Sequence, residues 1–142
     1  MRFVKTIGFG AILLAVSACA TGLFSNEGAK PFPPLDPAKG RVFVYRTGTF
    51  GSAYSPEVML NGERVIKLDR SGVFFRDVLP GSYAVTTTMT AKVVNFAVAA
   101  GEKKYVRFTS SFFESRMVPE LVDAAKGEAE TAGLSRLGPG QK

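Results

Sequence analysis

Apolar and polar side chains alternate in short runs between residues 41 and 113, and clusters of turn-forming residues separate these runs. A period of two indicates strands that bury one face. The predicted strands cover residues 41–47, 57–60, 63–68, 73–78, 82–90, 92–98 and 103–113. About seven short strands joined by tight turns predict an all-β fold, a small antiparallel β-sandwich, rather than a parallel α/β sheet.

Two of the connecting turns carry a specific conformational signal. Asn61-Gly62 lies between two strand-like runs and is typical of a type I′ hairpin turn, which needs a positive φ at both positions. Pro80-Gly81 fits the central positions of a type II turn, with Gly81 at the position of positive φ. On this interpretation, strands 73–78 and 82–90 pair with each other across the second turn.

The period of two is lost after residue 113, in the segment 114–142. Pro119 can serve as the first residue of a helix. Apolar positions recur at helical spacing in Leu121, Ala125, Ala129 and Ala132. The sequence therefore predicts a short C-terminal helix docked on the sandwich and followed by a frayed tail, with an extra edge strand through residues 117–122 as the alternative.

Residues 1–18 have the layout of a secretory signal peptide. The basic residues Arg2 and Lys5 precede an apolar run over residues 7–16, and two small residues follow it. A helix that crosses a membrane needs about 20 apolar residues, roughly twice the length of this run. The pattern therefore favours a signal over a transmembrane anchor.

Residues 19–40 begin with the only cysteine, Cys19, so an internal disulfide framework is excluded. The segment is rich in proline and glycine without a repeat, which predicts a tether to the sandwich domain at 41–113. Phe32 and Leu35 are apolar enough to dock part of this tether on the domain instead.

The chain has no histidine, which removes the commonest general base and the commonest metal ligand. The carboxylates left as candidates for acid–base chemistry are Glu63, Asp69 and Asp77, and each lies in or beside a predicted turn, where solvation is expected. We therefore expect no enzyme activity, no metal and no cofactor.

The net charge is +6 and falls to +4 when residues 1–18 are removed, with 16 basic and 12 acidic residues remaining. These basic residues are scattered, and Lys103-Lys104 is the only adjacent pair after residue 18. Proteins that bind nucleic acid concentrate their positive charge in a patch, so no nucleic-acid partner is expected.

The connection at residues 47–56 is the best candidate for a partner-binding loop. It is ten residues long, uncharged, and contains Phe50 and Tyr54, with Arg46 immediately before it. Long loops on rigid scaffolds often carry binding contacts. The alternative is that the two aromatic rings cap the open end of the sandwich and that Arg46 is an ordinary residue at a strand end.

Val16-Ser17-Ala18-Cys19 resembles the lipobox of bacterial lipoproteins: an aliphatic residue, two small residues and the acylated cysteine. The resemblance implies diacylglycerol and N-acyl chains on Cys19, and more than one acyl chain gives stable anchoring. In these signals an aspartate after the cysteine retains the protein at the inner membrane. Ala20 stands there, which implies the periplasmic face of the outer membrane.

Four pieces of the remaining chain, "GRVFVYR", "GSAYSPEVMLNGERV", "LPGSYAV" and "AAGEKKYVRF", resemble in their order a bacterial lipoprotein family, domain-of-unknown-function family 2846. This family is similar to PEGA-type and carboxypeptidase-regulatory-like modules, which are small transthyretin-like or immunoglobulin-like sandwiches. The resemblance implies a fold and a compartment but no activity, so it transfers no catalytic residue.

Together these observations predict a non-catalytic, lipid-anchored envelope protein that serves as a protein-interaction or scaffold module. Other envelope proteins are the expected partners. The alternative is a module that binds a small ligand or a glycan. Sugar sites use planar polar side chains and aromatic platforms, and three Asn, one Gln and no Trp make a glycan the less favoured ligand.

Overall fold

The computed structural model describes residues 31–48, 54–111 and 116–138. Within these ranges the chain forms nine strands and one helix. The elements are β1 (Gly40–Arg46), β2 (Glu57–Leu60), β3 (Glu63–Lys67), β4 (Gly72–Val78), β5 (Gly81–Thr87), β6 (Val94–Val98), β7 (Lys103–Ser111), β8 (Arg116–Val122), α1 (Ala124–Thr131) and β9 (Ser135–Arg136).

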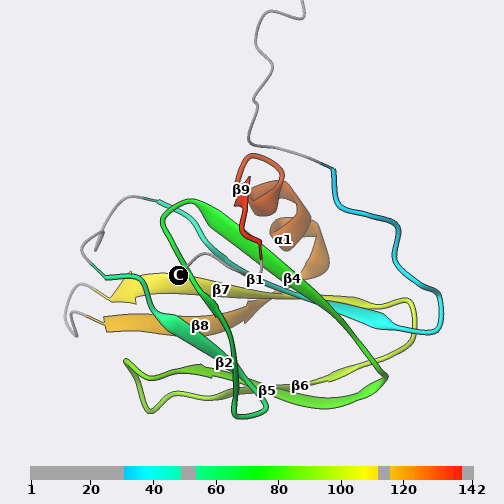
Figure 1. Cartoon of the computed structure of the whole chain (residues 1–142), viewed down its shortest axis with the longest axis horizontal. Coiled ribbons are helices and arrows are strands. Elements are labelled where there is room, and N and C mark those ends of the chain that lie inside the picture. Colours follow the sequence, from blue (N-terminus) through cyan, green and yellow to red (C-terminus); the bar gives the residue numbers. More distant parts are fainter. Residues whose placement is uncertain (1–30, 49–53, 112–115, 139–142) are drawn as a thin grey trace, which may run out of the picture.

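The strands build two facing sheets (Figure 1). Sheet A has the strand order β8-β7-β1-β4-β9, and sheet B has the order β3-β2-β5-β6. The predicted all-β sandwich is therefore confirmed. All seven predicted strands are present, although the fifth ends at Thr87 rather than at residue 90. β8 and β9 are additional to these seven.

The space between the two sheets is filled by alternate side chains of both. The core contains Val44, Val106 and Phe108 from sheet A and Val58, Val85 and Val98 from sheet B. The alternation in β6 and β7 thus places Val98, Val106 and Phe108 in the core. The period of two correctly indicates which side chains face the core.

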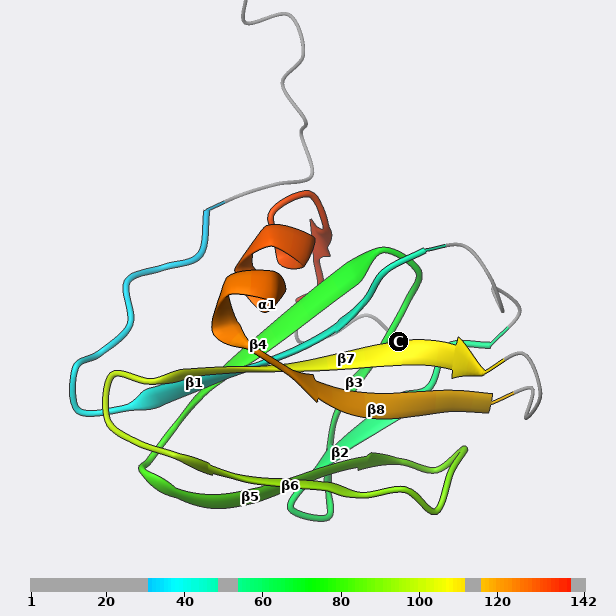
Figure 2. The same cartoon turned by 180° about the vertical axis from the view of Figure 1, so that it is seen from behind.

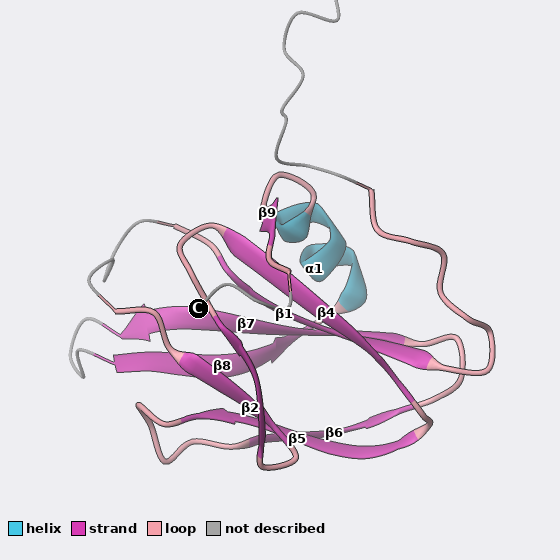
Figure 3. Ribbon diagram, viewed as in Figure 1, coloured by secondary structure: helices cyan, strands magenta, loops and turns pink. Residues whose placement is uncertain are grey.

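β1 is the central strand of sheet A, and all seven of its residues are buried. Sheet B covers one face of sheet A, and α1 covers the other, as Figure 3 shows. β1 pairs with β4 antiparallel and with β7 parallel, and β9 also pairs parallel with β4. Two parallel pairings therefore occur in a sandwich predicted to be antiparallel. β7 runs parallel to β1 because the chain passes through sheet B between β4 and β7 and returns to sheet A in the direction of β1.

The hairpin between β2 and β3 is confirmed. Asn61 and Gly62 have φ values of 48° and 80°, as a type I′ turn requires. The Asn61 side chain also accepts a hydrogen bond from the backbone N–H of Ala84, with a distance of 2.8 Å. This bond ties the hairpin to β5.

The predicted type II turn at Pro80-Gly81 is wrong. Gly81 is the first residue of β5, and among the described glycines a positive φ occurs at Gly48, Gly62 and Gly101 only. β4 lies in sheet A and β5 in sheet B, so the predicted pairing of residues 73–78 with 82–90 is wrong as well. β1 pairs with β4 along nearly its whole length, and β9 pairs with its first two residues, Gly72 and Val73, whereas β5 pairs with β2 and β6 in the other sheet.

Both alternatives for the C-terminal segment occur, one after the other. Residues 117–122 belong to the edge strand β8, and α1 follows. Pro119 lies within β8, opposite Phe108, so its prediction as the first helical residue is wrong. An edge strand tolerates a residue without an N–H. The helix is capped by Asp123, whose carboxylate accepts a hydrogen bond from the Lys126 N–H at 2.9 Å.

The buried face of α1 also differs from the prediction. Ala125, Ala129 and Ala132 are exposed, and the buried helical residues are Gly127 and Thr131. A β-carbon at position 127 would lie 2.2 Å from Cγ of Tyr105. The helix contacts sheet A through its smallest residue, so an apolar stripe of alanines does not identify this face.

Candidate functional site

The outer face of sheet A, away from sheet B, carries an aromatic cluster. Phe43 and Tyr105 stack with their ring centroids 4.6 Å apart and their planes within 1°. Phe32 makes edge contacts with Phe43 at 5.0 Å and with Phe75 at 5.4 Å. Phe32 thus docks the end of the expected tether on the sandwich, in agreement with the alternative prediction.

Arg41 fixes the same segment by its charge. Its side chain is 2% exposed, and its Nε and Nη2 bind the two carboxylate oxygens of Asp77 at 2.5 and 2.9 Å. Nη1 donates to the carbonyl oxygen of Pro33 at 2.6 Å. The guanidinium holds the pKa of Asp77 below its ordinary value, mainly through the side-chain hydrogen bond. Arg41 therefore joins β1, β4 and residues 31–36 into one unit.

A second ionic cluster ties α1 to sheet A. The Tyr45 hydroxyl donates to Glu130 Oε2, while Arg107 donates to Glu130 Oε1 at 2.8 Å and to Glu120 at 2.9 Å. Burial, and next the hydrogen bond to Glu130, raise the pKa of Tyr45. The hydrogen bond from Arg107 lowers the pKa of Glu120. Each charged side chain of this cluster lies in an ion pair with a group of opposite sign, which suits a structural role.

The predicted partner-binding loop is described in part. Arg46 is 1% exposed, and its Nη1 donates to the backbone carbonyl of Tyr54 at 2.7 Å. Burial, and next the charge of Arg70, lower the pKa of Arg46. Tyr54 is 58% exposed, and Phe50 lies outside the described residues. Arg46 therefore holds the end of the loop from inside the fold, while Tyr54 is open to a partner.

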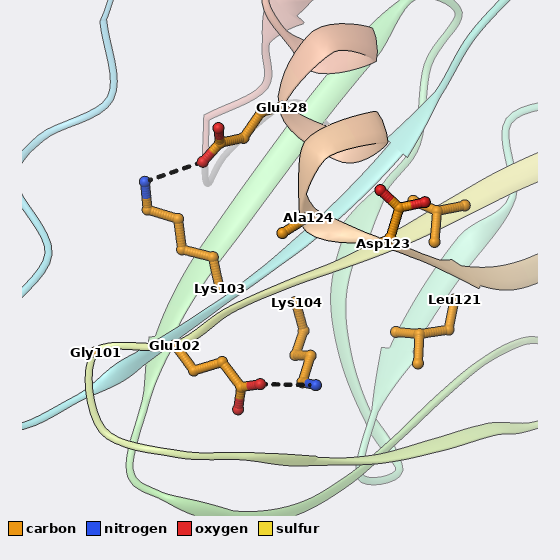
Figure 4. A pocket seen from close by; sticks show the side chains of 9 residues that line it. Gly101, Glu102, Lys103, Lys104, Leu121, Asp123, Ala124 and Glu128 are labelled. Atoms are coloured by element: carbon orange, nitrogen blue, oxygen red, sulfur yellow. Dashed lines mark ion pairs between the residues drawn. The ribbon is translucent and has the colours of Figure 1, made fainter.

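A shallow pocket of about 660 Å³ lies where β7 extends past the end of β8 (Figure 4). Lys103 faces Glu128 of α1 at 3.6 Å, and Lys104 pairs with Glu102 at 2.8 Å. The bond from Lys104 holds the pKa of Glu102 below its ordinary value. The lining contains both signs of charge and no aromatic ring. Such a surface suits a small polar ligand better than a sugar ring.

The three carboxylates considered for acid–base chemistry each interact with a different side chain. Asp77 binds Arg41, Glu63 forms an exposed pair with Arg76 at 3.2 Å, and Asp69 accepts from Ser55 at 2.8 Å. No group of three His, Cys, Asp or Glu side chains suited to a metal ion occurs in the described part of the chain. In the same part, no helix has the length and apolar character needed to cross a membrane. Cys19 lies outside the described residues.

The sequence analysis did not identify the two buried arginines as structural residues. Arg41 and Arg46 stand at opposite ends of the most buried strand of the molecule. A cation next to an otherwise apolar run is the signal that could have identified them, because a buried charge needs a partner. Partners such as Asp77 and the backbone carbonyls of Pro33, Pro34 and Tyr54 are visible only in the folded chain.

The geometry defines a class of protein: a two-sheet β-sandwich whose larger sheet is covered by a short helix and an N-terminal strap, residues 31–36. A family model with the description "Protein of unknown function (DUF2846)" matches residues 36–119, more than half of the chain. The chain belongs to this family. No curated protein and no solved structure matches this chain.

Proposed function

We propose that this protein is a non-catalytic lipoprotein of the bacterial envelope, anchored through acyl chains on Cys19 and serving as a protein-interaction or scaffold module. The sequence Val16–Cys19 after an apolar run is the observation that carries the proposal. Two or more acyl chains give stable membrane attachment without a spanning helix. Ala20, in place of an aspartate, favours the periplasmic face of the outer membrane.

The docked strap limits how far the domain lies from its anchor. Phe32 is fixed on sheet A, so only the chain between Cys19 and Phe32 can extend. At 3.3–3.6 Å per residue, this length reaches at most about 45 Å. The strap enters beside α1, on the side opposite sheet B (Figures 1 and 2). Sheet B and the exposed side chain of Tyr54 then remain open to partners in the periplasm.

The non-catalytic part of the proposal is supported by the chemistry of the side chains. The chain has no histidine, and each carboxylate candidate is engaged with a different partner: Asp77 with Arg41, Glu63 with Arg76 and Asp69 with Ser55. Tyr54 supplies an exposed aromatic ring at the end of a long uncharged loop. Such rings are common anchors at protein interfaces.

Cell fractionation with mass spectrometry tests the anchor. The wild-type chain should be found in the outer-membrane fraction, start at Cys19 and carry acyl mass, whereas Cys19→Ser should accumulate as an uncleaved or mislocalised precursor. Ala20→Asp is the matched control, because it keeps the cysteine and should move the acylated protein to the inner membrane. A wild-type protein that is soluble without detergent and lacks acyl mass would refute the anchor.

Crosslinking in intact cells tests the interaction module. We expect specific envelope proteins to be captured by the wild-type chain and lost from Tyr54→Ala. Leu79→Ala is the matched control, because Leu79 is also an exposed apolar side chain but lies at the other end of β1 from the loop. It directly follows Val78, which pairs with Gly40 at the start of β1.

Binding of a small ligand is the second candidate, favoured by the pocket between β7 and α1. Ligand binding abolished by Lys104→Ala, with no protein captured by the wild type, would favour this candidate instead.

A further inference from the structure

The four edge strands of the sandwich differ in how they are protected against pairing with another chain. Exposed edges are normally blocked by charge, by proline or by shortness. In the described part of the chain, β9 has only two residues, β8 contains Pro119, and β3 carries Glu63, Arg64 and Lys67. β6 has none of these devices.

β6 is an uncharged edge with an accessible outer side. Its one neighbour in sheet B is β5, and residues 93–99 contain no charged side chain. Asn95 and Ala97 are exposed, and Phe96 is only partly buried against the core. The backbone groups of β6 that point away from β5 are therefore positioned to pair with a further strand.

The sequence of β6 is nearly symmetric about Phe96. Antiparallel pairing of this strand with a second copy would place Phe96 opposite Phe96, Val94 opposite Val98, and Asn95 opposite Ala97. Alternate side chains would then continue the inner apolar face of sheet B from one copy into the other. The strand is thus complementary to itself.

The surroundings of β6 fit the same occupant. Residues 93–99 carry no charge, so no like charges meet where the two strands pair in this register. Val93, 47% exposed, precedes β6, and Leu121, 40% exposed, lies in β8, which contacts β6 on the same side of the sandwich (Figure 2). Association would cover both of these apolar side chains.

We propose that two copies of this chain associate through β6, forming an antiparallel pair centred on Phe96 that joins the two B sheets into one. Five residues from each copy make a small contact, so the dimer is weak and depends on protein concentration. This association goes beyond the proposed function and does not depend on the lipid anchor.

Sedimentation equilibrium of the full chain in a mild detergent tests the proposal. The double variant Asn95→Lys/Ala97→Lys puts two lysine pairs directly opposite each other, and should weaken the dimer by about tenfold or more. The matched control Asn95→Glu/Ala97→Lys changes the same exposed positions but places glutamate opposite lysine, and should retain the dimer. Equal thermal unfolding midpoints of the two variants would show that both are folded.

A wild-type dimer that the lysine pairs disrupt and the glutamate–lysine pairs preserve supports this register. A wild-type chain that stays monomeric at its highest soluble concentration overturns the proposal and leaves the edge to a strand of another protein. A dimer that persists in the lysine variant also overturns it, because the copies then associate elsewhere.

Discussion

Gly127 of α1 lies so close to Tyr105 of β7 that a β-carbon at position 127 would fall 2.2 Å from Cγ of the ring. Glycine inside an exposed helix normally costs about 1 kcal/mol relative to alanine. Here the helix backbone rests directly on an aromatic ring that is itself stacked on Phe43. The usual preference for alanine is therefore reversed at this position.

Gly127→Ala should lower the free energy of unfolding by about 1–3 kcal/mol, the usual cost of an atom forced into a packed site. Urea titration followed by circular dichroism measures this change. Gly133→Ala is the matched control, because a β-carbon there meets nothing within 4 Å. If both variants were as stable as the wild type, α1 would not lie on Tyr105.

Asp77→Asn should destabilise the protein by about 1.5–3 kcal/mol at neutral pH, since it removes charge-assisted hydrogen bonds from the buried Arg41. The pKa of Asp77 is lower in the folded chain than in the unfolded chain, where it is about 3.9. The contribution of the ionised Asp77 to the free energy of unfolding is therefore complete above about pH 5 and is lost as the pH falls below about 4.

Titrations at several pH values check this dependence. The difference between wild type and Asp77→Asn should shrink on acidification. Glu63→Gln, which removes an exposed pair with Arg76, should change the free energy of unfolding by at most about 1 kcal/mol. A difference for Asp77→Asn that is independent of pH would contradict the ion pair.

Phe32→Ala should release the strap and lower the free energy of unfolding by about 1–3 kcal/mol, because it removes two edge contacts and a partly buried ring. Limited proteolysis with a protease of broad specificity should then cut the strap earlier than in the wild type. The exposed Lys39 lies between the strap and β1, so Lys39→Ala should leave stability and the cleavage rate nearly unchanged. Equal cleavage of all three proteins would argue against docking of the strap.

Gly62→Ala should cost about 1–2 kcal/mol, because position 62 has a φ of 80°, in the left-handed region. Gly81→Ala should change stability by less than about 0.5 kcal/mol, since its φ is not positive and its nearest neighbour, Tyr83, stands 4.0 Å away. Chemical denaturation of the two variants side by side checks this contrast. A larger loss of stability for Gly81→Ala than for Gly62→Ala would instead support the type II turn at Pro80-Gly81 that the sequence predicts.

The strands were predictable because each needs only its own pattern. Alternation placed Val106 and Phe108 in the core, and Asn61-Gly62 fixed its hairpin through φ preferences that are local to two residues. The order of the strands was not predictable in this way. Whether β5 pairs with β4 or with β2 and β6 is decided by residues outside both β4 and β5, so the pattern of either strand alone does not reveal it.

The contacts of α1 were also not predictable from the local sequence pattern. Helical spacing favoured Ala125 and Ala129 as contacts, yet Gly127 makes the contact because the ring of Tyr105 leaves no room for a β-carbon. For the candidate loop, Arg46 and Tyr54 were identified from the sequence, but the burial of Arg46 was not. One of its hydrogen bonds goes to the backbone carbonyl of Tyr54, and a backbone acceptor cannot be recognised from the sequence.

The parallel pairing of β1 with β7 has a consequence for how the molecule is made. Arg41 pairs with Lys103, about sixty residues further along, and contacts of such long separation slow folding. During synthesis β1 emerges early and can meet β4, but one of its edges stays open until β7 has appeared. A nascent chain that stops before residue 103 therefore leaves one edge of β1, the most buried strand of the protein, unpaired. We expect such a chain to aggregate, or to need a chaperone, until the later strands have been synthesised.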